Sequence, residues 1–282
     1  MTNFKIEGKL ILALILFINT FYVFASSERY LELADSADYL IGKEKWIEAE
    51  SKIMEALRLE PANFNNSLLL SNLGIVQIQK GEYDKAIDSF SLGLKIAPSS
   101  SVLLNNRAKG YLFLEKFDLA AIDLDKSLEK DSIQEWPIQT RAFIYLKEGY
   151  PEKAKNLFNF LSDKFPENAM AHTGMAYVYE AEGDFENAIS EYNRALEIDS
   201  EDVETLCSKI FLLIETENYQ EARKEISQAL AKYPDNPLFY LQRGYLHKLN
   251  FRLNEAEADR KIAIEKGLDS HYVDKFIPNP RR

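Results

Sequence analysis

Small and large apolar residues recur along this chain at a fixed distance, separated by polar residues. Seven alanines mark the period, and after a first step of 37 residues every step is 34: Ala49, Ala86, Ala120, Ala154, Ala188, Ala222 and Ala256. Large apolar residues recur four positions later, at Ile53, Phe90, Leu124, Phe158, Tyr192 and Ile226. Residues at this spacing share one helix face. The period predicts stacked helix pairs in which each pair buries apolar surface of its neighbours.

Each period divides into two helices joined by a tight turn. In the copy from residue 169 to 202, helical spacing runs on both sides of Gly183-Asp184. Gly81-Glu82 and Gly149 stand at the same phase in other copies. Glycine accepts turn conformations and aspartate caps the following helix, so we expect antiparallel helices here. Prolines that cannot continue a helix end several pairs, at Pro61, Pro98, Pro166 and Pro234.

The first helix of each pair also carries a small residue where two helices approach closely. This column is Ala37, Gly74, Ala108, Ala142, Ala176, Ile210 and Gly244, with isoleucine as the single large member. The second copy, with Leu70, Leu73-Gly74, Tyr83, Ala86, Phe90, Gly93 and Pro98, resembles the tetratricopeptide repeat family in period and pattern. The resemblance covers seven copies, from Tyr30 to about Ser270. It implies an all-α fold, a right-handed α-solenoid superhelix of antiparallel helix pairs.

The predicted organisation is therefore one solenoid over residues 26–270 and a short tail over 271–282. Its repeats are 30–63, 67–100, 101–134, 135–168, 169–202, 203–236 and 237–270. The first junction is longer by Asn63 to Asn66, which predicts a different packing angle or a slightly extended helix there. In the last copy Arg260 replaces the large apolar residue, as expected of an end repeat that meets water. We expect the tail residues Tyr272, Val273, Phe276 and Ile277 to cover that end.

The first 25 residues differ from the repeats. Lys5 and Lys9 precede an apolar run from Leu10, and Val23 and Ala25 are small enough for a signal peptidase site. This pattern favours a cleaved secretory signal at residues 1–25 and an exported protein, periplasmic or extracellular. An uncleaved membrane anchor over residues 5–25 and a buried first helix are the alternatives, although the run is short for a bilayer span.

Composition and motifs argue against catalysis, metal binding and a nucleic-acid partner. The formal net charge of −11 disfavours a nucleic-acid partner. Cys207 is the single cysteine, and the three histidines are too far apart in the repeat pattern to share a metal. Phosphate-binding and nucleophile motifs are missing from the sequence. We therefore expect neither an enzyme nor a cofactor or metal site.

The family resemblance implies a concave groove lined by the first helices. In each first helix, one groove position directly follows the small residue of the column that begins with Ala37. A second groove position lies seven residues before the first one. The candidate partner-binding residues are Ile75, Asn105, Lys109, Trp136, Phe143, Met170, Tyr177, Phe211, Leu238 and Tyr245. Four of them, Phe143, Tyr177, Phe211 and Tyr245, form an aromatic series at the repeat period. This series either binds a partner, packs between neighbouring first helices, or mediates self-association.

These features predict an exported scaffold that binds a protein or peptide, as an extended segment or a helix, in its groove. Two alternatives stay open at this point. One is a self-associating structural component, a homo-oligomer. The other is an N-terminally anchored assembly factor of the cell envelope, which contacts the membrane only if residues 1–25 are retained.

Overall fold

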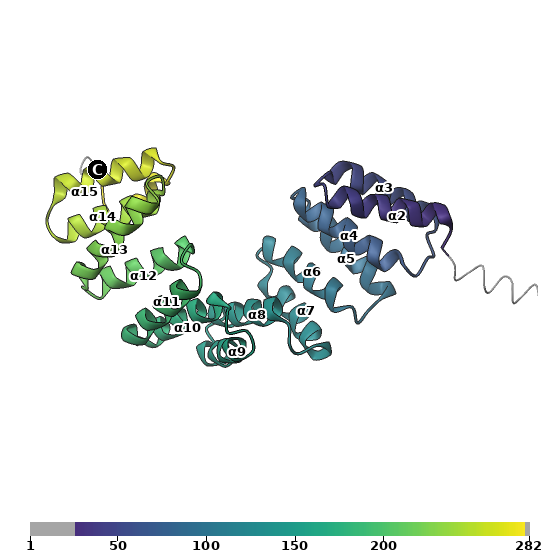
Figure 1. Ribbon diagram of the computed structural model, residues 1–282, viewed down its shortest axis with the longest axis horizontal. Helices are drawn as coiled ribbons and strands as arrows, with labels where there is room; N and C mark the ends of the chain where they lie inside the picture. The colour runs from purple at the N-terminus through teal and green to yellow at the C-terminus, as the bar shows by residue number, and fades with distance from the viewer. Residues whose placement is uncertain (1–25, 280–282) are drawn as a thin grey trace, which may run out of the picture. The chain divides into compact units, whose positions relative to one another are not determined.

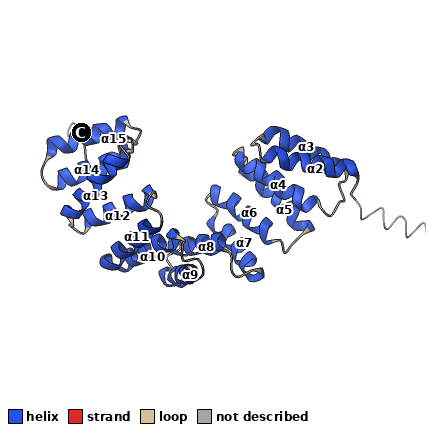
Figure 2. Cartoon of the chain, in the orientation of Figure 1, coloured by secondary structure: helices blue, strands red, loops and turns tan. Residues whose placement is uncertain are grey.

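The computed structural model of the chain describes residues 26–279, so the expected signal or anchor lies outside the described residues. Within that range the chain forms fifteen α-helices and no strand (Figure 2). None of these helices is long and apolar enough to cross a membrane. The helices are α2 (Glu28–Ile41), α3 (Trp46–Leu59), α4 (Asn66–Gln79), α5 (Tyr83–Ile96), α6 (Ser101–Phe113), α7 (Phe117–Lys130), α8 (Glu135–Lys147), α9 (Pro151–Lys164), α10 (Ala169–Glu182), α11 (Phe185–Ile198), α12 (Val203–Glu215), α13 (Tyr219–Lys232), α14 (Pro237–Leu249), α15 (Leu253–Glu265) and α16 (Ser270–Asp274).

Successive helices form seven pairs, from α2 with α3 to α14 with α15, and each pair occupies one predicted repeat. The two helices of a pair lie side by side, as α2 with α3 and α14 with α15 do in Figure 1. The prediction of an all-α array of antiparallel helix pairs is confirmed.

Contacts within the described chain group the helices into two compact units, over residues 26–137 and 138–279. The division falls inside α8, so the fourth repeat contributes to both. One continuous solenoid over residues 26–270 stays a prediction.

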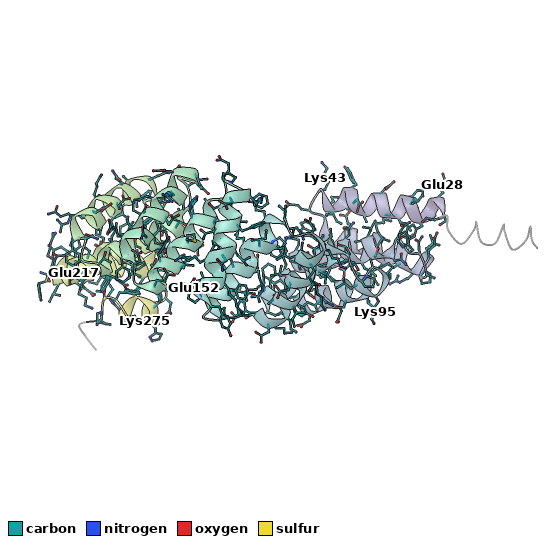
Figure 3. The ribbon with its side chains drawn as sticks, turned by 90° about the horizontal axis from the view of Figure 1, so that it is seen from below. Glu28, Lys43, Lys95, Glu152, Glu217 and Lys275 are labelled. Atoms are coloured by element: carbon teal, nitrogen blue, oxygen red, sulfur yellow. The ribbon has the colours of Figure 1, made fainter. Side chains whose placement is uncertain are left out.

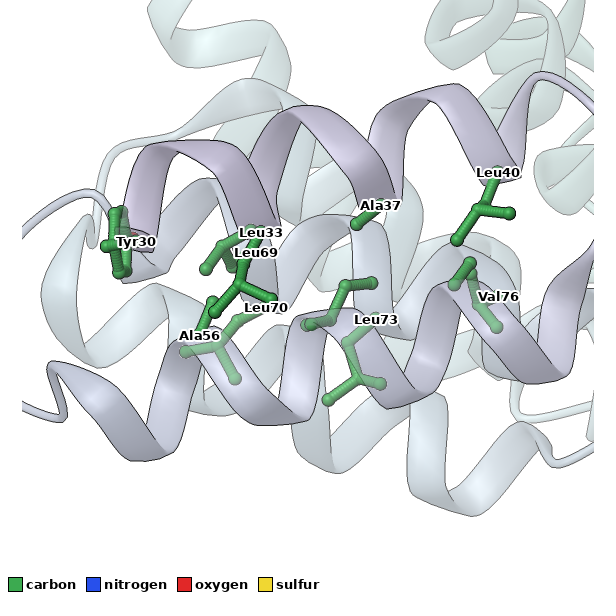
Figure 4. Packing of buried hydrophobic residues seen from close by; sticks show 11 residues of the cluster. Tyr30, Leu33, Ala37, Leu40, Ala56, Leu69, Leu70, Leu73 and Val76 are labelled. Carbon is green, nitrogen blue, oxygen red and sulfur yellow. The ribbon is translucent and has the colours of Figure 1, made fainter. Parts of the chain in front are cut away.

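The core of the first unit lies where the faces of α2, α3 and α4 meet (Figure 4). Ala37 and Ala49 of the small columns and Ile53 of the large column are fully buried there, as the sequence pattern predicts, beside Tyr30 and Leu33. α4 and α5 approach closely at Gly74, where an added Cβ would lie 2.3 Å from Cε1 of Phe90. Such a contact is far inside van der Waals distance, which explains the glycine.

The turn between the two helices of a pair has a left-handed residue at one fixed position in all seven pairs. Three of these residues are the predicted Gly81, Gly149 and Gly183, with φ between 75° and 80°. The other four are Glu44, Glu115, Glu217 and Phe251, with φ between 55° and 61°. Because L-residues with a side chain are strained in this region, the turn is set by the packing of the repeat, and glycine only relieves it.

Three pairs also carry an ion pair between their two helices, with one of the two side chains buried and the partners sixteen residues apart in the sequence. Arg107 binds Asp123 through two bonds of 2.7 Å, and Arg243 binds Asp259 at 2.9 and 2.7 Å. In the third pair, Lys209 Nζ lies 2.9 Å from a carboxylate oxygen of Glu225. The carboxylates of Asp123 and Asp259 are only 2% and 5% exposed. These contacts were not predicted from the sequence.

The longer first junction does not extend the helix after it, because α4 has 14 residues, as α2, α3 and α5 do. α4 begins at Asn66, one residue before the predicted repeat, and Asn66 donates hydrogen bonds to the backbone oxygens of Glu60 and Pro61. The Tyr30 hydroxyl donates to the Asn66 side chain at 3.0 Å, which ties the junction to the first helix of the array. Charged side chains such as Glu28, Lys43 and Lys95 point outward from this unit (Figure 3).

The C-terminal tail closes the second unit with the short helix α16. Val273 and Ile277 are buried against the last pair, as expected, but Tyr272 is 37% exposed and covers less than predicted. Arg260 does not face water. It is 7% exposed and donates to Asp274 at 2.5 Å, so the residue that replaced a large apolar one holds the tail in place.

Candidate functional site

Three of the predicted groove residues line one pocket of the second unit. Phe143 comes from α8, while Met170 and Tyr177 stand two turns apart on α10. The pocket has a volume of about 290 Å³, and its remaining wall is made by Thr173 of α10 and by the start of α12, with Asp202, Glu204 and Thr205. This is close to the small end of ligand pockets, roughly 300 Å³, so it has the size for one side chain of a partner.

The aromatic rings of the pocket rest on buried rings behind them. Phe143 meets Phe158 edge to face at 5.1 Å between centroids, and Tyr177 meets Tyr192 at 5.9 Å. Phe143 and Tyr177 also contact each other at 6.3 Å. Phe158 and Tyr192 have no exposed surface, whereas Phe143 and Tyr177 are half-buried. The two outer rings, Phe143 and Tyr177, therefore pack against the core and also line the pocket. Packing and partner binding, two of the roles considered for this series, are thus compatible for these rings.

Polar residues at the start of α12 fix the opposite wall. Asp202 caps the helix and accepts from the backbone N–H groups of Glu204 and Thr205 at 3.0 and 3.1 Å. The Thr205 hydroxyl donates to Asp202 Oδ2 at 2.6 Å and lies 2.9 Å from the Thr173 hydroxyl. The Tyr177 hydroxyl is held by Ser208 at 3.1 Å. These bonds keep the wall rigid without any bound partner.

Carboxylates surround the Tyr177 phenol. Its pKa is raised, first because of burial and further because of the negative charges of Glu204, Glu180 and Asp202. Burial also raises the pKa of Glu180, whose carboxylate accepts a hydrogen bond from Tyr192. Glu204 is exposed at the pocket rim, and no described residue forms an ion pair with it. The pocket thus combines aromatic walls with a negative electrostatic potential.

The first unit brings together another predicted set, Asn105 and Lys109 of α6 with Trp136 at the start of α8. Lys109 Nζ lies 4.7 Å from the centre of the Trp136 ring, a cation–π contact. Asn105 donates to the Gln134 side chain at 2.9 Å, while its own Oδ1 is buried with no hydrogen-bond partner among the described residues. Asn105 therefore holds the loop before α8, and Lys109 with Trp136 forms the accessible part of this cluster.

The other predicted residues lie apart from the pocket. Ile75 packs against the buried cluster of Phe90 and Leu94. Leu238 packs on the core of the second unit, beside Phe239.

The last two members of the aromatic series pack against a ring of the C-terminal tail. The ring of Phe276, from the tail, lies 5.3 Å from Phe211 and 5.4 Å from Tyr245. Lys248 secures this arrangement by donating to the Phe276 backbone oxygen at 2.7 Å. The tail was expected to cover the end repeat, and it covers this part of the predicted groove as well.

The sequence reading missed the polar half of the pocket. Glu204 occupies the second predicted groove position of its repeat, seven residues before Phe211, whereas Asp202, Thr173 and Thr205 lie outside the predicted groove positions. One signal was available, a polar column at the 34-residue period directly before the first helices, namely Ser100, Gln134, Asn168, Asp202 and Asn236. Four of these five side chains cap the helix that follows them. Over residues 26–279, no cluster of three or more His, Cys, Asp or Glu is arranged to hold a metal ion.

Comparison with known proteins places the repeat pattern in a family. Residues 62–243, well over half of the chain, match the family model described as coatomer epsilon subunit. The chain belongs to the coatomer epsilon subunit family. It is also a tetratricopeptide repeat protein, because its relatives and its fold carry that repeat.

Two relatives of this family member are much longer than it is. Tetratricopeptide repeat protein 8 of Caenorhabditis elegans is 33% identical over 103 residues, which cover 36% of this chain and 20% of the relative. Anaphase-promoting complex subunit 3 of Schizosaccharomyces pombe is 21% identical over 226 residues, 80% of this chain and 34% of the relative. The chain thus spans about a third or less of the length of either.

A solved structure matches the fold over nearly its whole length. A tetratricopeptide repeat protein from Parabacteroides merdae superposes with a TM-score of 0.76 at 21% identity, covering 89% of this chain and 98% of that one. At this identity the likeness establishes the fold, while the pocket residues must be argued from this chain itself.

Proposed function

We propose that this protein is a scaffold that binds another protein through the pocket of Phe143, Met170 and Tyr177. The observation that carries the proposal is that two half-buried aromatic rings and a thioether line a pocket that no described side chain fills. Rings already held by core packing lose little entropy when a partner covers them, so they suit an anchor site. A relative that is by name a subunit of the anaphase-promoting complex supports a role in an assembly.

Site-specific photo-crosslinking tests this function in the producing cell. A photoreactive phenylalanine replaces Met170 in the pocket, and in a matched control it replaces Phe251, which is 90% exposed on a turn of the same unit. We expect a discrete covalent adduct from position 170 and none from position 251. A folded variant that gives no adduct at 170, or the same adducts at both positions, refutes the pocket as the binding site.

We further propose that the protein is exported after removal of residues 1–25. Support comes from the basic and apolar pattern of that segment and from Ser27, which caps α2, so that cleavage after Ala25 leaves the first helix with its cap. N-terminal sequencing of the protein purified from the exported fraction is expected to begin at Ser26. Retention of Met1 in a membrane fraction instead supports the anchored assembly factor.

A further inference from the structure

The pocket has a chemical asymmetry that its size and apolar walls do not explain. One side is the aromatic and thioether surface of Phe143, Tyr177 and Met170, and the other carries the carboxylates of Asp202 and Glu204. Of the described residues that line it, none carries a positive charge. An occupant therefore meets an apolar wall first and negative charge at the far side.

The two carboxylates are placed for different tasks. Asp202 is fixed by three donors of the first turn of α12, so its position does not change when a partner arrives. Glu204 is exposed at the rim with no ion-pair partner among the described residues. An incoming cation would meet one rigid and one adjustable acceptor. An incoming carboxylate would be repelled by both.

The nearest lysine of α12 does not neutralise this site. Lys209 is buried, and its ammonium group lies 2.9 Å from a carboxylate oxygen of Glu225 of α13. Its charge is thus balanced away from Asp202 and Glu204. The whole chain, at a net charge of −11, adds to the attraction of positive partners at long range.

Resting on the proposed function, we infer that the pocket takes the side chain of an arginine or lysine from a partner protein. The aliphatic stem lies against Met170 and Phe143, the cationic head contacts the Tyr177 ring, and the charge is met by Glu204 and Asp202. This uses both halves of the pocket, whereas an apolar side chain uses only the first. The partner segment is therefore basic at this position.

Titration of the full-length, isotope-labelled chain with short alanine peptides tests the inference. The peptides differ only in a central arginine, norleucine or glutamate, and binding is followed through the backbone amide signals of Glu204 and Thr205. We expect the arginine peptide to bind about three to five times more tightly than the norleucine peptide, the size of one exposed ion pair. The glutamate peptide should bind most weakly.

Two variants separate the charge from the fold. Glu204→Gln should remove most of the preference for arginine over norleucine, while Glu186→Gln, an equally exposed first-turn carboxylate on α11, should leave it unchanged. Raising NaCl from about 0.05 M to about 0.5 M should weaken only the arginine peptide. Equal binding of arginine and norleucine, or a preference for glutamate, overturns the inference.

The outcome also distinguishes this inference from the function on which it rests. If norleucine binds as well as arginine, the pocket is an apolar anchor and the scaffold function stands. If no peptide shifts the pocket signals but the crosslinker at position 170 still captures a partner, only the basic anchor is refuted. If both experiments fail on a folded protein, both proposals fall.

Discussion

The buried ion pair between Arg107 and Asp123 offers the sharpest test of how the first unit is held together. Two bonds of 2.7 Å join the guanidinium of α6 to the carboxylate of α7, and the carboxylate is 2% exposed. Asp123 raises the pKa of Arg107 chiefly through these hydrogen bonds. The pair thus stays charged, and its two members depend on each other in the protein interior.

Replacing Arg107 by methionine keeps most of the apolar stem and removes the charge. Asp123 is then left buried without its cation, which costs about 3–5 kcal/mol in the free energy of unfolding. Because whole domains are stable by only about 5–15 kcal/mol, such a loss is easily measured. The double variant Arg107→Met with Asp123→Leu should recover most of it, since an apolar pair of similar size is often nearly neutral.

Urea unfolding followed by tryptophan fluorescence measures the effect in the right place. The chain has two tryptophans, Trp46 and Trp136, and both belong to the first unit. The matched control is Arg29→Met. Arg29 pairs with Glu55 at 3.0 Å, but both side chains are about half exposed, at 55% and 47%, so the loss should be at most about 1 kcal/mol. A loss below about 1 kcal/mol for Arg107→Met, or no recovery in the double variant, refutes the reasoning.

Three further predictions concern single residues of the second unit and one control. In urea unfolding, Gly174→Ala should lower the free energy of unfolding by about 1–3 kcal/mol, because the new Cβ would lie 2.2 Å from the Phe158 ring. The control Gly42→Ala should change it by less than about 0.5 kcal/mol, because the atom nearest to its new Cβ lies at 3.5 Å. Cys207 is 5% exposed and burial raises the pKa of its thiol from 9.0 to about 12, so iodoacetamide should modify it only after unfolding. As the pH rises, the thiol of the unfolded chain releases its proton before the thiol of the folded chain. The contribution of Cys207 to the free energy of unfolding is therefore intact below pH 9.0 and is lost as the pH rises towards 12. Cys207→Ala should reduce the dependence of the free energy of unfolding on pH in that range. Phe251→Gly should stabilise the folded state by about 0.5–1 kcal/mol and so raise the melting temperature, because glycine accepts the left-handed φ of 60° and the replaced side chain is 90% exposed. An unchanged or lower melting temperature contradicts the strain argument.

The repeat was predictable because its determinants are local and occur seven times. A small residue such as Gly74 faces a large one such as Phe90 within the same copy, and five of the seven copies have a small and a large apolar residue at this spacing of sixteen residues. The ion pairs were not predictable in this way. They occur in three copies of the seven and join helices across a turn, so no single column of the sequence identifies them.

The aromatic series shows the limit of periodicity for the site. Phe143, Tyr177, Phe211 and Tyr245 occupy equivalent positions, and the period correctly puts them on corresponding helix faces. What lies over each face is decided elsewhere. Asp202 lines the pocket beside Tyr177 because it caps the helix that follows it. Phe276 contacts Phe211 because Arg260 and Lys248 hold the tail in place. Equivalent residues therefore have different neighbours: a polar wall beside Tyr177, and a covering ring over Tyr245.

This difference also explains why the binding face is better sought in the middle of the array than at its end. An end repeat must cover its own apolar surface, and here the tail does so with Val273, Ile277 and Phe276. Within the second unit, the fifth repeat packs against both the fourth and the sixth, so its first helix, α10, can present half-buried rings at no further cost in exposed core. Tyr177 meets that condition, Phe143 of α8 contacts its ring, and the cap of the next helix supplies polar groups beside them. The proposed binding pocket between repeats of the second unit thus depends on the same stacking that keeps that unit folded.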